Sequence, residues 1–500
     1  MHLTTEKWRT EEMKKLLSLL ALILVCVLAM TMGASAQVNA DVKVSAIAEV
    51  YTYHQIKAFV LEYPTEIAEP EEGTYTIVDF APAHMKEDYD QRPYAEAVIT
   101  AVYTNDAPEM REDKTSVPGK YVIIEQELVN GSFFDEKDEI WKPNNLCGLA
   151  TWRNAGERSE HFRENYNELI ISQKKNVVNS AGETVVASGI LPTLQKADVH
   201  TLVLDDFNIT TLPSYNGKYD IHYSIHIPAD YDASVKYPVV FCCHGGGGYL
   251  QYKIQLAEDG ITPTTVAGDL GRDAVAVAFA RDASVPAIVI AHQRLLGAPE
   301  EWEVNDVEDE ITLIDYLDKN YSIDRDRIVQ IGSSAGTHFT AEFITAHPDV
   351  LAGFMMCNGD FLGANIFKPE YRSRGGEAIT TSTDAMAFNL IHPDCFVSEE
   401  EYAAEKAKFK DVVENRLPIY IWHAVNDENA TWTHAVSTYR LLCESYQEAG
   451  LSYDEIQQLV LFHFADNPEY YNYGICEMHA TSKLAVDYTW AIDWLLSQHK

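Results

Sequence analysis

The spacing of hydrophobic residues changes once along the chain, near residue 205, and this change predicts two kinds of domain. Before it, short runs rich in Val, Ile, Tyr and Thr are separated by turn clusters such as Asn130-Gly131-Ser132, which is typical of an antiparallel β-sandwich. The less regular stretch 137–178 is predicted to be a long loop with helical turns. The predicted strands are Val42–Val50, Ile56–Leu61, Tyr75–Phe80, Ala95–Tyr103, Tyr121–Leu128 and Val199–Leu204.

After residue 215, predicted strands alternate with predicted helices, which indicates a mostly parallel α/β sheet with helices on both faces. Pro238–Cys243 and Ala287–Ala291 are continuous apolar runs, as expected of strands buried on both faces. Tyr219–Ile227 alternates like an edge strand, and Val304–Leu317 has the period of an amphipathic helix. Further strands are predicted at Arg327–Ile331, Ala352–Met356, Pro418–Trp422 and Leu459–Phe464, and further helices at 434–449 and 480–497.

The predicted domain boundary lies near 205–218, because Asn208–Lys218 is rich in Thr, Pro, Ser, Asn and Gly. We therefore expect a β-sandwich domain at 37–210 and an α/β domain at 211–500.

One connection within the second domain is far longer than the fold requires. Residues 361–417 lie between two predicted strands and include Tyr371, Phe388 and a helical stretch, Glu399–Glu414. A segment of this length is typical of a lid over a site, and the alternative is a surface decoration.

The N-terminus has the pattern of a secretory signal peptide over residues 1–36. Lys14 and Lys15 precede an apolar run, Leu16–Met30, and Ala34-Ser35-Ala36 supplies the small residues before cleavage. The run is shorter than the roughly 20 residues that span a bilayer, so an uncleaved anchor is the weaker alternative. The polar stretch before Met13 is long, which leaves Met13 as an alternative start. We expect a secreted or extracellular protein, periplasmic in a Gram-negative cell, with no stable membrane insertion after cleavage.

Charge and cysteine usage exclude several classes of partner and cofactor. The chain has 76 acidic and 38 basic residues, and a surface this negative repels phosphate backbones, so no nucleic-acid partner is expected. No zinc-type spacing of His or Cys is present and no GxGxxG follows a strand, so we expect neither metal nor cofactor. Removal of Cys26 with the leader leaves an odd number of cysteines, hence at least one free thiol. Cys395 and Cys476 fall in predicted loops, where pairing between them is one alternative.

Gly332-Ser333-Ser334-Ala335-Gly336 carries the strongest chemical signal in the sequence. It follows a predicted strand directly and precedes a predicted helix that begins near Thr337. This is the context of a nucleophile elbow, in which a tight turn with small neighbours presents a serine hydroxyl above the sheet. Ser334 is the predicted nucleophile.

A glycine run, His244-Gly245-Gly246-Gly247-Gly248, follows an earlier buried strand. Acyl transfer places negative charge on a carbonyl oxygen, and backbone N–H donors in such a loop can approach that oxygen without side-chain obstruction. The predicted oxyanion-hole donors are the amides of Gly246 and Ala335, with Gly245 as a third.

A serine nucleophile needs a base and a group that orients the base, and in this kind of fold they follow the serine in the order acid, histidine. Asp427 lies in the loop after the predicted strand Pro418–Trp422, and His479 lies ahead of the last predicted helix. Asp360 is the competing acid. His423 and His463 lie beside strands and are expected to pack in the core or behind the site.

The catalytic half resembles secreted bacterial esterases related to polyhydroxybutyrate-depolymerase-like enzymes and predicted peptidases. The segments that carry the resemblance are Tyr237–Gly248, Tyr321–Gly336 and His423–Asp427, and Ile56–Glu127 resembles the immunoglobulin-like domain of such enzymes. The resemblance implies an α/β-hydrolase with a Ser334, Asp427 and His479 triad and a supporting N-terminal domain. The chain has Ala335 and Thr337 where many relatives have Met and Gly. Gln293 and Trp302, which follow the predicted strand Ala287–Ala291, are expected to line the acyl or alcohol pocket.

Three functions remain open from the sequence. The leading hypothesis is a serine carboxylesterase that hydrolyses short-chain acyl or aryl esters, including esters on polysaccharides, through an acyl-enzyme. The second is a secreted serine peptidase with the same triad. The third is a glycan-binding β-sandwich fused to an inactive hydrolase. The sequence indicates no oligomeric state.

Overall fold

The computed structural model describes most of the chain. The predicted signal peptide and its cleavage site lie outside the described residues. Within the described part, no helix is both long and apolar enough to cross a membrane. The described residues are 39–50, 54–79, 95–127, 132–135, 140–143, 166–246, 250–251, 274–296, 298–372, 379, 381–425, 427, 429–466, 479 and 482–500.

The N-terminal half contains two packed antiparallel sheets. The larger has the strand order β13-β1-β2-β6-β5, with only the β1–β13 pair parallel, and the smaller has the order β12-β9-β3-β4. Side chains that alternate inward from both sheets, such as Phe59, Ile77 and Ile171, form one buried core. The strands are β1 Lys43–Val50, β2 His54–Ile67, β3 Tyr75–Asp79, β4 Ala95–Glu96, β5 Ile99–Asn105, β6 Gly119–Gln126, β9 Leu169–Gln173, β12 Gly189–Ile190 and β13 Val199–Thr201.

One prediction for this half is wrong. The stretch 137–178, expected to be a loop with helical turns, contains β9, which pairs with both β3 and β12 inside the smaller sheet. Leu169, Ile171 and Gln173 are buried in alternation, so one face of the strand packs into the core of the sandwich, and the segment is not a loop. Two short hairpins accompany the sheets: β7 Ser132–Asp135 with β8 Ile140–Pro143, and β10 Val177–Val178 with β11 Thr184–Val186.

The C-terminal half is built on an eight-stranded sheet of order β14-β15-β18-β16-β20-β21-β22-β23. The strands from β18 to β23 run parallel, whereas β14 and β15 are antiparallel to their neighbours. The strands are β14 Asn208–Pro213, β15 Asp220–His226, β16 Tyr237–Cys243, β18 Ile288–Gln293, β20 Ile323–Ser333, β21 Gly353–Cys357, β22 Ile419–Ala424 and β23 Val460–Ala465. A short parallel pair, β17 Leu250–Gln251 with β19 Leu295–Leu296, lies outside this sheet.

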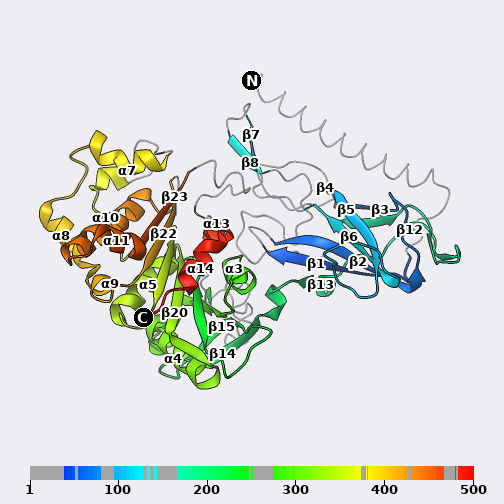
Figure 1. The fold of residues 1–500 in the computed structure, drawn as a ribbon, viewed down its shortest axis with the longest axis horizontal. Coiled ribbons are helices and arrows are strands. Elements are labelled where there is room, and N and C mark those ends of the chain that lie inside the picture. Colours follow the sequence, from blue (N-terminus) through cyan, green and yellow to red (C-terminus); the bar gives the residue numbers. More distant parts are fainter. Residues whose placement is uncertain are drawn as a thin grey trace.

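Helices cover both faces of this sheet (Figure 1), as the sequence predicted. One face packs under α4, α5 and α10, and the other under α3, α13 and α14, so the central strands are buried on both sides. The helices are α3 Ala274–Asp282, α4 Asp306–Asn320, α5 Ala335–Ala346, α6 Pro369–Arg372, α7 Ser382–Ile391, α8 Glu399–Ala407, α9 Lys410–Glu414, α10 Trp432–Glu448, α11 Tyr453–Leu459, α13 Ser482–Asp487 and α14 Thr489–Leu496.

The edge of the sheet differs from the prediction. Tyr219–Ile227 was expected at the edge, but β15 lies between β14 and β18, and β14 is the edge strand. The linker-like composition of residues 208–213 hid this strand, although an edge strand tolerates a terminal Pro213 because that position need not donate to a neighbour. A division at 210/211 therefore cuts β14.

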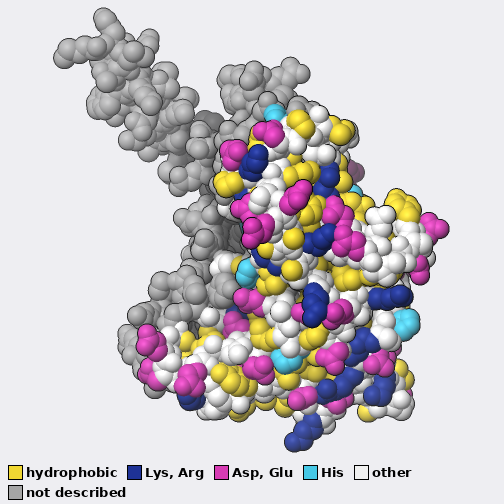
Figure 2. Space-filling model, turned by 90° about the vertical axis from the view of Figure 1, so that its left-hand side faces the viewer, with side chains coloured by type: hydrophobic (Ala, Val, Ile, Leu, Met, Phe, Trp, Pro, Cys, Tyr) yellow, Lys and Arg dark blue, Asp and Glu magenta, His cyan; other side chains and the backbone are white. Residues whose placement is uncertain are grey.

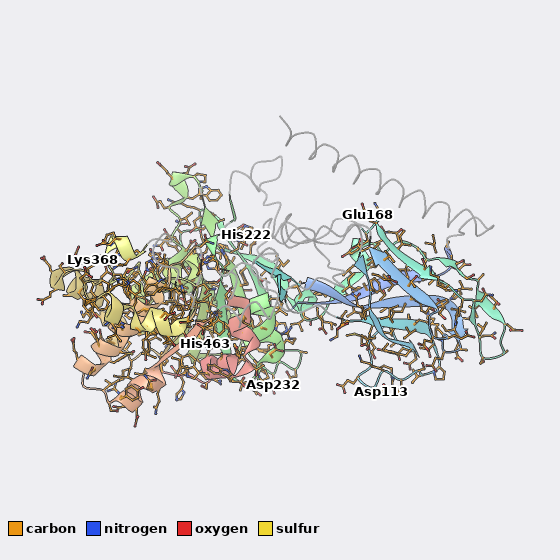
Figure 3. All side chains as sticks on the ribbon, turned by 90° about the horizontal axis from the view of Figure 1, so that it is seen from above. Asp113, Glu168, His222, Asp232, Lys368 and His463 are labelled. Atoms are coloured by element: carbon orange, nitrogen blue, oxygen red, sulfur yellow. The ribbon has the colours of Figure 1, made fainter. Side chains whose placement is uncertain are left out.

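A short strap joins the two halves, which lie side by side along the long axis of the molecule (Figure 3). β13 pairs with β1 of the sandwich, and within a few residues Leu204 and Phe207 enter the buried core of the second half. Both side chains are about 5% exposed or less, so the strap is anchored at each end.

The segment 361–417 packs as a layer continuous with the main core. Phe361, Phe367 and Phe409 are at most 1% exposed, and the rings of Phe361 and Phe409 stack with centroids 4.7 Å apart. On the side of the molecule where α7 and α8 lie, acidic and basic side chains are interspersed with hydrophobic ones (Figure 2). Whether part of the segment moves as a lid stays a prediction, but its base is bound into the core.

Phe409→Ala is expected to destabilise the α/β half by about 3–5 kcal/mol, because it leaves a cavity where a fully buried ring was stacked. Urea unfolding followed by tryptophan fluorescence measures this loss. Tyr453→Ala is the matched control, since Tyr453 is 73% exposed, and it should change the free energy of unfolding by about 0.5 kcal/mol or less. Equal effects of the two substitutions would contradict a packed layer.

Candidate active site

Ser334 occupies a strained turn between β20 and α5. Its backbone has φ 54° and ψ −120°, outside the regions that a serine ordinarily adopts, and its side chain is partly exposed. The turn is held because the Ser334 amide donates to the carbonyl of Cys357, 3.0 Å away, and the Ser334 carbonyl accepts from the amide and hydroxyl of Thr337. This is the strand–turn–helix geometry predicted for a nucleophile elbow.

The two glycines that flank the elbow, Gly332 and Gly336, have no room for a side chain. A Cβ atom on Gly332 would lie 2.6 Å from the carbonyl oxygen of Gly336, and one on Gly336 would lie 2.2 Å from the carbonyl oxygen of Cys243. No side chain fits at either position without moving the backbone. The start of α5 is therefore pressed against the end of β16, where the glycine loop begins.

Ser334, His479 and Asp427 form a continuous hydrogen-bonded relay. The Nε2 atom of His479 lies 2.7 Å from the Ser334 Oγ, and its Nδ1 atom lies 2.8 and 2.9 Å from the two carboxylate oxygens of Asp427. With Nδ1–H donating to the carboxylate, Nε2 is left to accept the serine proton. The three residues predicted from separate loops are thus brought together in the order that general-base activation requires.

The Asp427 side chain is fully buried and fixed by main-chain donors. Its Oδ1 atom accepts from the amides of Asn429 and Ala430 at 2.7 and 2.8 Å, while the His479 side chain remains 20% exposed. The imidazole therefore has a rigid partner on one side and access to a substrate on the other.

Asn358 is a positioning residue that sequence reasoning missed. It follows β21, is 0% exposed, and has a positive φ of 49°. Its side-chain Nδ2 group donates to the carbonyl of His479 at 3.1 Å, and its side-chain oxygen accepts from the backbone amide of Ala424, three residues before Asp427, at 3.0 Å. One side chain thus ties the histidine to the strand that carries the acid. The only signal in the sequence was a polar residue directly after a buried strand.

The competing acid, Asp360, has a different partner. Its carboxylate lies 2.9 Å from the Nδ1 atom of His338 and also accepts from the amide of Gly363. The hydrogen bond to Asp360 raises the pKa of His338. Asp360 therefore pairs with His338 on α5 and does not belong to the relay of His479.

The other histidines predicted to be supporting residues pack away from the serine. His423 is 0% exposed with its Nε2 atom 3.1 Å from the carbonyl of Ala430, and burial lowers its pKa to about 4. His463 stacks on Trp422 with ring centroids 4.3 Å apart.

The glycine loop lies directly against the nucleophile. A Cβ atom on Gly245 would be 3.1 Å from the Cβ and 3.7 Å from the Oγ of Ser334, and one on Gly246 would be 3.9 Å from the Cβ of Ala335. The amide of Ala335 is in the first turn of α5, where N–H groups have no partner within the helix. Of the residues predicted to form an oxyanion hole, Gly245 therefore lies beside Ser334 and Gly246 beside Ala335, and the donor role of their amides stays a prediction. Gly247 and Gly248 lie outside the described residues.

The two predicted pocket residues contact residues other than the relay. Gln293 is 3% exposed at the end of β18, with its Nε2 atom 3.4 Å from the Nε2 atom of His244. Trp302 stacks on Tyr219, ring centroids 5.7 Å apart, beside the antiparallel edge of the sheet. Their contact with a substrate stays a prediction.

Neither a metal-binding group nor a disulfide occurs in the described part of the chain. No cluster of three His, Cys, Asp or Glu side chains there could hold an ion. Cys395, considered as a partner for Cys476, is a free and buried thiol, and Cys476 itself lies outside the described residues.

Comparison with known proteins agrees with this architecture. Residues 43–186 match the esterase Ig-like N-terminal domain, and residues 297–457 match the prolyl oligopeptidase family. No curated protein sequence matches the chain.

Solved structures share the fold at low sequence identity. A thermostable esterase aligns over 91% of this chain and 99% of its own, with a TM-score of 0.57 and 19% identity. An esterase from the archaeon Pyrobaculum calidifontis aligns over 57% and 82%, with a TM-score of 0.35 and 16% identity. A thermophilic carboxylesterase from a metagenomic library aligns over 59% and 89%, with a TM-score of 0.34 and 13% identity. The likeness to the thermostable esterase is one of fold.

The predicted fold class and the family resemblance are confirmed by the two domain matches taken with the two sheets described above. The chain thus joins an N-terminal domain that matches the esterase Ig-like domain to an α/β-hydrolase domain, part of which matches the prolyl oligopeptidase family.

Proposed function

We propose that this esterase-family hydrolase is a serine carboxylesterase that cleaves short-chain acyl or aryl esters through an acyl-enzyme. The observation that carries the proposal is the unbroken hydrogen-bonded relay from Asp427 through His479 to the Ser334 hydroxyl, placed on a strained elbow. An inactive glycan-binding protein would have no need to retain this strain and alignment.

The reaction follows from the roles that the geometry supports. The Ser334 Oγ attacks the ester carbonyl while His479 Nε2 takes its proton, and Asp427 holds the imidazole and stabilises its positive charge. The amides of Gly246 and Ala335, with Gly245 as a third donor, bind the oxyanion of the tetrahedral intermediate. His479 then protonates the departing alcohol. Water, activated by the same histidine, attacks the acyl-serine ester, releases the acid and restores the serine hydroxyl.

Hydrolysis of p-nitrophenyl esters from acetate to octanoate tests the proposal. The chain without its leader should hydrolyse the short esters fastest, and Ser334→Ala should reduce kcat to the background rate because no other group can form the acyl-enzyme. Ser333→Ala is the control, since Ser333 bonds to Ser482 and not to the relay. Full activity in Ser334→Ala would contradict the mechanism.

A second pair of variants separates the two candidate acids. Asp427→Asn should lower kcat by about 10⁴-fold, because an amide favours the wrong histidine tautomer. Asp360→Asn should leave kcat within about tenfold of the wild type, since its partner is His338. Initial rates with p-nitrophenyl acetate measure both, and a larger loss in Asp360→Asn would overturn the assignment.

A peptidase is the second candidate, favoured by the match of residues 297–457 to the prolyl oligopeptidase family. The same relay cleaves amides, so the ratio of ester to matched p-nitroanilide hydrolysis decides between the two. A ratio below one would favour the peptidase.

Export is also proposed, on the strength of the sequence pattern at residues 1–36. Expression of the full chain in a bacterium should yield a mature protein in the periplasm or medium that begins at Gln37. N-terminal sequencing checks this, and a retained Met1 or Met13 would contradict it.

A further inference from the structure

A buried arginine lies directly beneath the glycine loop. Arg294 follows β18 and is only 2% exposed. Its guanidinium donates to the carbonyl oxygen of His244 at 2.8 Å, and its backbone amide donates to the Nε2 atom of the same histidine at 3.1 Å. Arg294 therefore holds both the main chain and the ring of His244.

These contacts fix the tautomer of His244. Since a backbone amide can only donate, the Nε2 atom must be the acceptor, and the proton of the neutral ring is on Nδ1. Nδ1 lies 2.8 Å from the carbonyl oxygen of Gly245, to which it donates. Burial and the charge of Arg294 lower the pKa of His244 to about 3, so the ring stays neutral in ordinary buffers.

The direction of the next amide follows from the peptide geometry. In a trans peptide the carbonyl of Gly245 and the N–H of Gly246 point in opposite directions. The hydrogen bond from His244 therefore turns the Gly246 N–H away from the histidine ring. Gly246 is also the loop residue beside Ala335, the second predicted donor.

Arg294 also contacts the helix that carries the second donor. Its guanidinium lies over the ring of Phe339 on α5, 4.8 Å from the ring centroid. Because α5 begins at Ala335, one side chain spans both elements that would have to converge on the oxyanion: the loop after β16 and the start of α5.

The surroundings of Arg294 argue against a purely structural role. Glu310 on α4 is 0% exposed, and burial raises its pKa to about 8. Burial also raises the pKa of Asp306 on the same helix, to about 7. The positive charge of Arg294 opposes both rises. Buried charges contribute little net stability compared with apolar residues of the same size. Such a cluster under the glycine loop is better explained by the position that it imposes.

We propose that Arg294 is a positioning residue for the oxyanion hole, an inference that rests on the proposed function. It holds His244 and α5 in one arrangement, so that the amides of Gly246 and Ala335 point at the same oxygen. Arg294 does not touch the reacting atoms, and it acts through His244 and Phe339.

Arg294→Met tests the proposal, with Arg440→Met as its matched control. Arg440 also lies over a phenylalanine, Phe396, and donates to a backbone carbonyl, that of Met386, but it joins α10 to α7 instead of the glycine loop. Both substitutions remove a guanidinium that lies over a phenylalanine ring and donates to a backbone carbonyl, although Arg440 is only partly buried, so both are expected to lower Tm.

The kinetic readout separates positioning from stability. With p-nitrophenyl acetate, well below the Tm of either variant, Arg294→Met should lower kcat about 100-fold with KM changed less than about threefold, as for loss of one oxyanion donor. The inhibition constant of an alkyl trifluoromethyl ketone, whose adduct with Ser334 carries the same oxyanion, should rise by a similar factor. Arg440→Met should change neither by more than about threefold.

Arg294→Lys keeps the positive charge and one hydrogen-bond donor. Compared with Arg294→Met, it should raise both kcat and the affinity for the ketone about tenfold. It also decides the matter if Arg294→Met does not fold, because it should then show a parallel loss of about tenfold in both readouts. Wild-type kinetics in a folded Arg294 variant, or a fall in kcat without weaker ketone binding, would overturn the proposal.

The same experiment distinguishes this inference from the proposed function. A wild-type protein that cleaves no ester yet binds the ketone through Ser334 would refute the esterase proposal, and ketone affinity in the Arg294 variants would still decide the positioning role. Ester hydrolysis with unaffected Arg294 variants would refute the positioning role alone.

Discussion

The close approach of α5 to the end of β16 is the constraint on which the site depends. At Gly336 the helix lies so near the carbonyl of Cys243 that no side chain fits between them. The chain enters this helix through Ser334, which adopts a positive φ. This contact places the nucleophile and the loop beginning at His244 side by side. The strain of one residue is compensated by the buried strands on either side, which prevent the turn from relaxing.

The parallel sheet supplies the remaining groups by bringing the carboxyl ends of its strands to one edge. Ser334 follows β20, Asn358 follows β21 and Asp427 follows β22, so three consecutive neighbours in the sheet contribute to one relay. His479 arrives from the connection after β23 and is held to this edge through Asn358 and Asp427. The order of residues in space follows the order of strands in the sheet, as is usual in open α/β folds.

Buried polar groups support the site in two places, around the relay and around the glycine loop. On the side of the relay, Asp427 and Asn358 use main-chain donors and acceptors to fix the imidazole. On the side of the glycine loop, Arg294 and His244 fix a peptide plane, and the charge of Arg294 opposes the rise that burial causes in the pKa values of the two carboxyl groups on α4. Buried polar groups of this kind are costly unless they are bonded, which is why each one restricts the backbone that it touches.

The sequence by itself determined the fold class, the two-part organisation and the order of the chemical groups along the chain. Periodicity was sufficient because strands buried on both faces, such as residues 238–243, are apolar throughout, and because the G-x-S-x-G turn admits few alternatives. Periodicity missed the strand β14, whose Thr- and Pro-containing edge sequence resembles a linker, and the strand β9. It also missed the helix α3, in which nearly every position is apolar. The single helix predicted at 480–497 is divided at Tyr488 into α13 and α14. Only the tertiary structure decided that Asp427 and not Asp360 faces His479, that Asn358 ties the two loops together, and that Arg294 lies under the glycine loop. Such contacts join residues far apart in sequence, and their partners are chosen by how strands are ordered in the sheet, which no local pattern records.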